Sequence, residues 1–170
     1  MMTKTGTAAL TILAGLSLFA LATREAHAGG KGSTKGKGRA CTIDGKPFKP
    51  AYAKREDSDA DFRIFVFGVA PSTDEERKSA CNRQAPIPPF ATRQEGRVIE
   101  IDFNDIEHPK NNVDVTFMTR TEGTSFLHEA AKTQVVDLAG KGASQTIHLK
   151  ATADDTDCEL SLPVVTCPKK

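Results

Sequence analysis

Closely spaced carboxylates are the first residues in this sequence that could do chemistry. Asp57, Asp59 and Asp61 have the D-x-D-x-D spacing that opens an EF-hand calcium loop. The turn glycine of that loop is replaced by Phe62 and its bidentate glutamate by Gly68, which excludes an EF-hand. A looser calcium site remains the alternative to solvated loop acids, either here or at a second acidic segment, Asp154, Asp155 and Asp157. Apart from such loosely bound calcium, we predict no cofactor.

The histidines do not form a recognisable metal site. His128-Glu129 begins like the H-E-x-x-H helix of zinc proteases, but Lys132 occupies the position of the second histidine. The other histidines of the exported part, His108 and His148, fall in separate predicted elements. A three-histidine zinc site would therefore require the fold alone to bring them together.

The serines offer no recognisable nucleophile. Ser144, in the segment GASQT, lacks the final glycine of the G-x-S-x-G nucleophile elbow, and no other serine fits better. We therefore predict no catalytic, cofactor-binding or metal-ligating residue. An enzyme would need a site assembled only in three dimensions.

Four cysteines, Cys41, Cys81, Cys158 and Cys167, predict a disulfide framework. No pair has the C-x-x-C spacing of redox or zinc sites. Three pairings are possible and the sequence does not choose among them, although 41/81 with 158/167 joins the cysteines that lie closest along the chain.

The first 28 residues have the form of a secretory signal peptide. Lys4 precedes an apolar run from Ala8 to Ala22, and Ala26-His27-Ala28 provides small residues at the cleavage positions. We predict cleavage between Ala28 and Gly29, with release of a secreted or periplasmic protein that keeps no integral membrane segment. The alternative is an uncleaved N-terminal anchor.

Residues 29–39 are predicted to form a flexible Gly/Lys-rich tail. The segment GGKGSTKGKGR has no apolar residue to bury and carries Lys31, Lys35, Lys37 and Arg39 without any acid. It is expected to serve as a solubilising spacer, and the alternative is loose attachment to an anionic envelope surface. The whole chain has a net charge of +1, so the body that follows this tail is mildly acidic, which argues against a nucleic-acid partner.

Residues 40–170 are predicted to form a single domain rich in strands. Cys41 to Ile43 and Lys46 to Ala53 read as a hairpin around Asp44-Gly45, placed at a sheet edge by Pro47 and Pro50. The most apolar run, Phe62 to Ala70, reads as a central strand buried largely on both faces.

Alternating side chains indicate further strands. Ile99, Ile101 and Phe103 share one face, and Val113, Val115 and Phe117 repeat the pattern, so the two strands are expected to be antiparallel neighbours. Four more candidates follow, the last two interrupted by Pro163, which suggests a bend or an edge: Gln134 to Leu138, Thr146 to Ala151, Cys158 to Leu162 and Val164 to Cys167.

One helix carries a clear signal and one a weak one. Ser72 to Cys81 starts with capping residues followed by Glu75 and Glu76, which predicts a short helix. Ser125 to Lys132 is a weaker candidate for a second helix. Between the two, Ala85 to Phe90 is expected to be an extended proline-rich loop.

These elements predict an all-β protein. About seven or eight short strands with one helix fit a disulfide-braced antiparallel β-sandwich, and a small β-barrel is the alternative. The expected function is that of a non-catalytic envelope or extracellular module that binds a protein, a glycan or an anionic surface, with the proline-rich loop as candidate contact. The alternatives are a small secreted hydrolase or metal-dependent enzyme and a secreted inhibitor-type scaffold.

Overall fold

A computed structural model describes residues 41–82, 84–85, 87–93, 96–105, 107–108, 112–123 and 125–168. The chain divides into two units, Met1–Ser33 and Thr34–Lys170, and all described residues belong to the second. The predicted signal peptide 1–28 and tail 29–39 lie outside the described residues.

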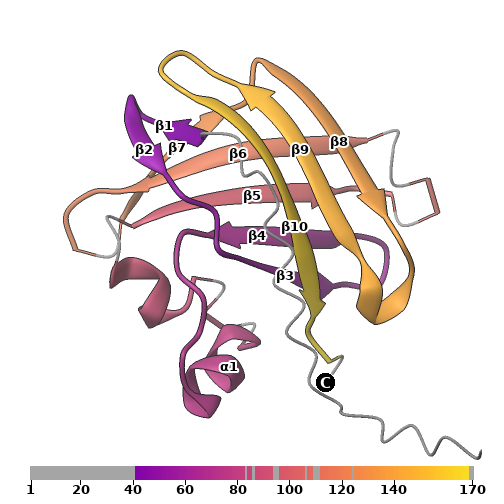
Figure 1. The fold of residues 1–170 in the computed structure, drawn as a ribbon. Helices are drawn as coiled ribbons and strands as arrows, with labels where there is room; N and C mark the ends of the chain where they lie inside the picture. Colours follow the sequence, from indigo (N-terminus) through magenta and orange to yellow (C-terminus); the bar gives the residue numbers. More distant parts are fainter. Residues whose placement is uncertain are drawn as a thin grey trace, which may run out of the picture. The chain divides into compact units, whose positions relative to one another are not determined.

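The described part is mostly β-structure, with ten strands, one α-helix and two short 3-10 helices, η1 (Pro89–Arg93) and η2 (Gly142–Ser144) (Figure 1). The strands and the helix are β1 (Cys41–Ile43), β2 (Lys46–Phe48), β3 (Tyr52–Asp57), β4 (Phe62–Phe67), α1 (Asp74–Ala80), β5 (Arg97–Phe103), β6 (Val113–Arg120), β7 (Phe126–Ala130), β8 (Thr133–Ala139), β9 (Thr146–Thr152) and β10 (Asp157–Thr166).

The strands form an open sheet in the order β2-β1-β10-β3-β4-β5-β6-β7, to which β9 and then β8 are added beside β10. All neighbours are antiparallel except β10 and β3, which run parallel. The purely antiparallel sheet predicted from the sequence is therefore wrong at this one pair. In Figure 1, β8, β9 and β10 cross over strands β3 to β7.

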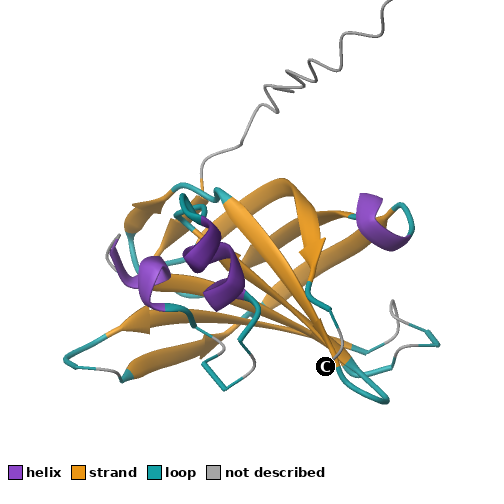
Figure 2. Cartoon of the chain, turned by 90° about the horizontal axis from the view of Figure 1, so that it is seen from below, coloured by secondary structure: helices purple, strands orange, loops and turns teal. Residues whose placement is uncertain are grey.

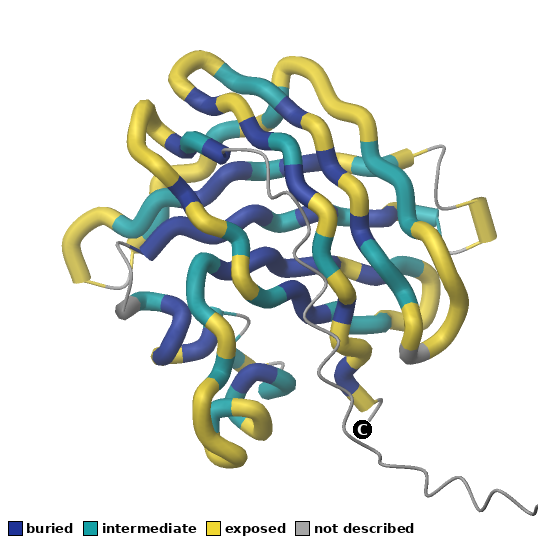
Figure 3. Tube along the Cα trace, in the orientation of Figure 1, coloured by how far each residue is buried: buried dark blue, intermediate teal, exposed yellow. Residues whose placement is uncertain are grey.

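Two apolar clusters explain why β4 and β5 are buried on both faces (Figure 3). The first cluster lies between the crossing strands and includes Ile64, Ile101 and Leu149. The second covers the other face of β4 and β5, where Phe67 packs with residues of α1 and η1 such as Phe90. Figure 2 shows these helical segments beside the sheet. The predicted central strand is thus confirmed as β4.

Helix α1 starts as its sequence predicts. Thr73 is the N-cap, and its Oγ1 accepts a hydrogen bond from the backbone N–H of Glu76 at 3.1 Å. The Glu76 carboxylate in turn accepts from the backbone N–H and the hydroxyl of Ser72 at 2.7 and 2.8 Å. These contacts satisfy N–H groups that a helix start leaves without partners.

The second predicted helix, Ser125 to Lys132, is wrong. Residues Phe126–Ala130 form strand β7, which pairs antiparallel with β6 through contacts such as Phe117 opposite Glu129. Helix-forming residues such as Leu127, Glu129 and Ala130 are overridden because the ladder with β6 gives the segment backbone partners that an isolated short helix lacks.

Pro163 does not divide the last strand. It lies inside β10, opposite Thr146 of β9. The other side of β10 pairs with β1 at Asp157 and with β3 from Val164 onward, so Pro163 falls between these two neighbours. On that side of β10, residues between these two neighbours have no ladder partner, so the missing N–H of proline costs little.

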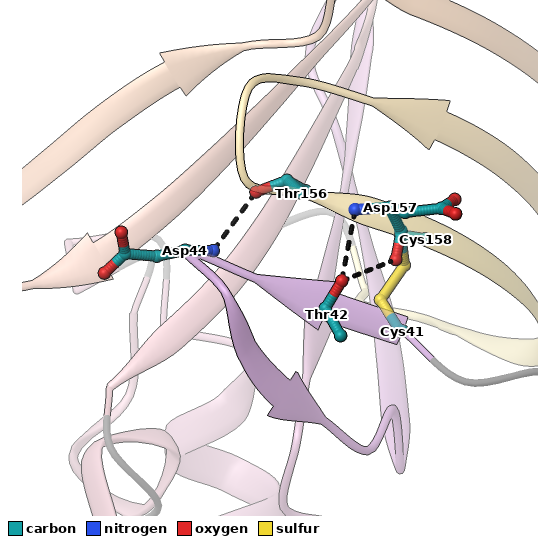
Figure 4. The surroundings of a disulfide bond; sticks show 6 residues. All are labelled: Cys41, Thr42, Asp44, Thr156, Asp157 and Cys158. Carbon is teal, nitrogen blue, oxygen red and sulfur yellow. Dashed lines mark hydrogen bonds between the residues drawn. A yellow bond between two sulfur atoms is a disulfide. The ribbon is translucent and has the colours of Figure 1, made fainter.

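The disulfides join Cys41 to Cys158 and Cys81 to Cys167. The first pins β1 to β10, and Thr42 Oγ1 reinforces it through hydrogen bonds to the backbone N–H and carbonyl of Asp157, both at 3.3 Å (Figure 4). The pairing between the closest cysteines along the chain does not form. Two disulfides are compatible with an extracytoplasmic protein.

Among the described residues, no helix has the length and apolar character needed to span a membrane.

Candidate functional site

Two carboxylates of the acidic segments weighed as loose calcium sites are engaged in ion pairs. Asp57 Oδ1 accepts a hydrogen bond from Arg55 Nε at 2.5 Å, and Asp154 forms an ion pair with Lys132. Asp59 lies exposed in the turn between β3 and β4. Within the described ranges, no three His, Cys, Asp or Glu side chains are grouped so that they could hold a metal ion.

Glu129 has a structural contact with the turn between β9 and β10. Its carboxylate accepts hydrogen bonds from the backbone N–H of Asp154 at 3.0 Å and from Thr156 Oγ1 at 3.4 Å. These bonds connect β7 to the turn between β9 and β10. His128 precedes Glu129 in β7 and so points to the opposite face of the sheet.

The remaining predicted candidates lie apart. His108 faces Asp105, with 3.2 Å between Nδ1 and Oδ2, in the loop after β5, while Ser144 belongs to η2. No hydrogen bond between described residues joins any two of His108, His128, Glu129 and Ser144.

The proline-rich loop, proposed from the sequence as a contact surface, places its aromatic ring inside. Phe90 is buried, with its ring centroid 6.1 Å from that of Phe67, and Ala91 is buried beside it. Residue 86 lies outside the described residues.

A different group of side chains gathers on the solvent side of β8, β9 and β10, which we call the outer β8–β10 face. Strand β9 alternates strictly, with Ile147, Leu149 and Ala151 in the core and His148 and Lys150 exposed. The side chains around them border a depression of about 430 Å³: Val135, Asp137, His148, Lys150, Glu159 and Ser161.

Strand register arranges these side chains in two rows across the sheet. His148 lies opposite Asp137 of β8 on one side and Ser161 of β10 on the other. Lys150 lies between Val135 and Glu159 in the same way. Directly opposite residues on antiparallel strands have Cβ atoms about 4.5–5.5 Å apart, so each row can contact one ligand group.

The row of Asp137, His148 and Ser161 has the residue types of a hydrolase triad. Acyl transfer also needs free N–H groups that point at the developing oxyanion. Strand β9 is paired on both sides, so its N–H groups are used in the ladders. The backbone of β9 therefore supplies no oxyanion hole for that chemistry.

Ion pairs occupy the part of the β3–β5 surface that α1 and η1 do not cover. Arg63 Nε lies 2.8 Å from Asp102, and its Nη1 lies 3.4 Å from Glu100. Burial raises the pKa of the Glu100 carboxyl, and the charge of Asp102 raises it further. Burial likewise raises the pKa of Asp102.

Lys54 is a buried cation next to these ion pairs. Its ammonium lies 2.6 Å from Glu56 and 5.0 Å from the centroid of the Phe65 ring, and the side chain is 0% exposed. Burial lowers the pKa of Lys54, while Glu56 opposes that effect. Its contacts with Glu56, Phe65 and Phe67 lie within β3 and β4.

Comparison with known proteins adds no residue to the candidate site. No family model matches the chain, and no curated protein or solved structure matches it. The outer β8–β10 face is defined by register, exposure and charge.

Proposed function

We propose that this chain is an exported, disulfide-braced β-sandwich protein that binds a protein partner without catalysis, outside the cytoplasm, through the outer β8–β10 face. Export rests on the signal-peptide pattern that ends at Ala28 and on the two disulfides. The sandwich would consist of the β8–β10 strands and the β3–β7 strands with the first apolar cluster between them.

One observation carries the proposal. Two rows of side chains, centred on His148 and Lys150, lie in register across β8, β9 and β10 at the depression of about 430 Å³. Binding groups on strands of a packed sheet are positioned more accurately than groups on loops. Because the backbone below them is already ordered, the protein would lose little additional conformational entropy when a ligand binds there.

The chemistry of the face favours a protein over the other expected ligands. Asp137 and Glu159 outnumber Lys150, so the face does not suit an anionic envelope surface. None of its residues is a phenylalanine, tyrosine or tryptophan, the aromatic residues on which sugars usually stack. Exposed Val135 next to both signs of charge is typical of a polar protein interface with an apolar contact point.

A photo-crosslinking amino acid at position 148 tests the proposal in the organism that carries the gene. We expect one discrete adduct with an extracytoplasmic protein, and none with the same amino acid at Glu75, an exposed position of α1. Lys150→Glu should abolish the adduct because it reverses the only basic charge of the face, whereas Glu75→Lys should leave it unchanged. Equal labelling from both positions, or no adduct at 148, would contradict the proposal.

A small secreted hydrolase is the second candidate, favoured by the order Asp137, His148 and Ser161 across three strands. The purified protein should be assayed on ester and peptide substrates together with Ser161→Ala. Turnover that the substitution abolishes would replace the binding proposal with this candidate. The partner crosslinked at position 148 could be a secreted enzyme that this protein inhibits. The inhibitor-type scaffold would then be one form of the proposed function.

Export is tested separately by mass spectrometry of the non-reduced product. The mature protein is expected to begin at Gly29 and to contain no free thiol, in line with the four bonded cysteines. A product that begins at Met1 would contradict cleavage.

A further inference from the structure

Three strands of the described part have a neighbour on one side only: β2, β7 and β8. An unpaired strand edge presents free N–H and C=O groups and can pair with another chain, so proteins usually protect such edges with proline, lysine, short length or covering groups. The three edges differ in this protection.

Strands β2 and β7 are protected. Strand β2 has three residues, with Pro47 next to Lys46. Strand β7 has five residues, and Glu129 ties it to the backbone of Asp154 in the turn between β9 and β10. Each edge therefore has at least one of the features that discourage pairing.

Strand β8 is longer, and apart from one tie, from Gln134 Nε2 to the carbonyl of Val113 at the start of β6, it lacks these protective features. Its seven residues, TQVVDLA, include neither proline nor glycine nor a basic side chain, and Asp137 is its only charge. Val135 is 69% exposed on the outer face, while Val136 and Leu138 pack only partly against the first apolar cluster. A strand added at this edge would bury more of all three side chains.

We infer that β8 of one molecule pairs antiparallel with β8 of a second copy, in a twofold dimer with a continuous sheet. The sequence of the strand fits itself when Val136 lies opposite the partner's Val136. Val135 is then opposite the partner's Asp137, Gln134 is opposite the partner's Leu138, and the two Asp137 side chains are not directly opposed. The register that pairs Asp137 with its own copy is disfavoured because directly opposed like charges destabilise a sheet.

Charge complementarity supports the register centred on Val136. Lys150 lies beside Val135 in the same row, and that row continues into the partner's Asp137 across the new edge. Each Lys150 would thus share a row with an acid of the other copy. A twofold axis uses each β8 edge once, so the assembly closes at two copies. The dimer would present two outer β8–β10 faces side by side, which goes beyond the proposed function.

The oligomeric state of the mature, oxidised protein tests the inference by sedimentation equilibrium over a dilution series. We expect a reversible monomer–dimer equilibrium. A monomer at every concentration, or a mass that keeps rising beyond the dimer, would overturn it.

Two substitutions at one exposed position test the register. Val135→Asp places two like-charge pairs against the partner's Asp137, one for each half of the symmetric contact, and should weaken dimerisation about tenfold. Val135→Lys creates two opposite-charge pairs and should strengthen it. If both variants shift the dimer dissociation constant in the same direction, the proposed register is wrong. Leu127→Asp, at an exposed apolar position of the protected β7 edge, should change nothing.

Hydrogen exchange gives a second readout that distinguishes the inference from the proposed function. Amides of β8 should become slower to exchange as the protein concentration rises, and those of β7 should not. If the unsubstituted protein dimerises as expected, the position-148 adduct with a foreign partner reports on the proposed function separately. Loss of that adduct with an intact dimer would contradict only the function.

Discussion

The β3–β7 strands and the β8–β10 strands differ in how many of their faces are covered. Strand β4 has five buried residues among its six, because the crossing strands cover one face and α1 with η1 cover the other. Strand β9 alternates between buried and exposed residues because only its inner face is covered. The first region can supply most of the stability, and the second can present side chains to a partner.

Lys54 shows what a charged side chain requires in the covered region. Its ammonium is buried against the Phe65 ring and has its carboxylate partner, Glu56, at 2.6 Å. An unpaired buried charge would cost several kcal/mol. On the outer β8–β10 face, by contrast, Lys150 is exposed to solvent.

The largest expected effect comes from opening a cavity in the doubly covered region. Phe67→Ala removes a fully buried ring that packs against Tyr52 and Phe90, with centroids 6.1 Å away in both cases. We expect the free energy of unfolding to fall by about 3–5 kcal/mol in urea titrations. Val135→Ala on the outer face should change it by less than about 0.5 kcal/mol. Similar losses for the two variants would contradict the contrast between the regions.

The disulfides give the next largest effect, and both fasten another segment to β10 or to the residue that follows it. Cys41–Cys158 fastens β1 to β10, and Cys81–Cys167 fastens the end of α1 to the end of β10, with sequence separations of 117 and 86 residues. Replacing either pair by alanine should lower the free energy of unfolding by about 2–4 kcal/mol. Because loop-closure entropy grows slowly with length, the two losses should agree within about 0.5 kcal/mol.

If the free energy of unfolding falls much further for one cysteine pair than for the other, that disulfide also maintains native contacts that are lost when it is removed. For Cys81–Cys167 these would be the contacts of Ala80 in the second apolar cluster. Near-ultraviolet circular dichroism of the folded variants would detect such a local change separately from the global unfolding transition.

Local patterns in the sequence predict most elements of this fold. The alternation in Ile99 to Phe103 gives β5, and the capping residues before Asp74 give α1, because both signals act within a few residues. Strand β7 is missed because its five residues favour a helix locally and become a strand only through pairing with β6. The parallel pair of β10 and β3 is missed for the same reason, since it joins segments far apart in the chain.

The candidate site is harder to predict than the fold. Asp137, His148 and Ser161 are widely separated in the sequence, and only the register of β8, β9 and β10 places them in one row. The sequence shows that His148 and Lys150 share one face of a strand, but it does not show which residues of the neighbouring strands lie opposite them. The cysteine pairing likewise depends on which strands become adjacent.

The smallest expected effect concerns the acids of the β3–β5 surface, where the covered region meets solvent. Glu100 has a side chain only 16% exposed, and burial together with Asp102 raises its pKa above 4.5. Below the unfolded pKa, both folded and unfolded chains hold the proton, and stability does not depend on it. As the pH rises through that value, the unfolded chain loses the proton first, so the free energy of unfolding falls until the folded pKa is passed.

Glu100→Gln should flatten this part of the stability curve. In urea titrations from about pH 4 to about pH 7, the decline with rising pH should be smaller than in the native protein. At the upper end, we expect the variant to be more stable by less than about 1 kcal/mol, because Arg63 keeps its contact with Asp102 at 2.8 Å. Glu75→Gln on α1 is the exposed control and should leave the curve unchanged. If the stability of Glu100→Gln depends on pH in the same way as that of the native protein, the Glu100 carboxylate is not destabilised by its surroundings in the folded protein.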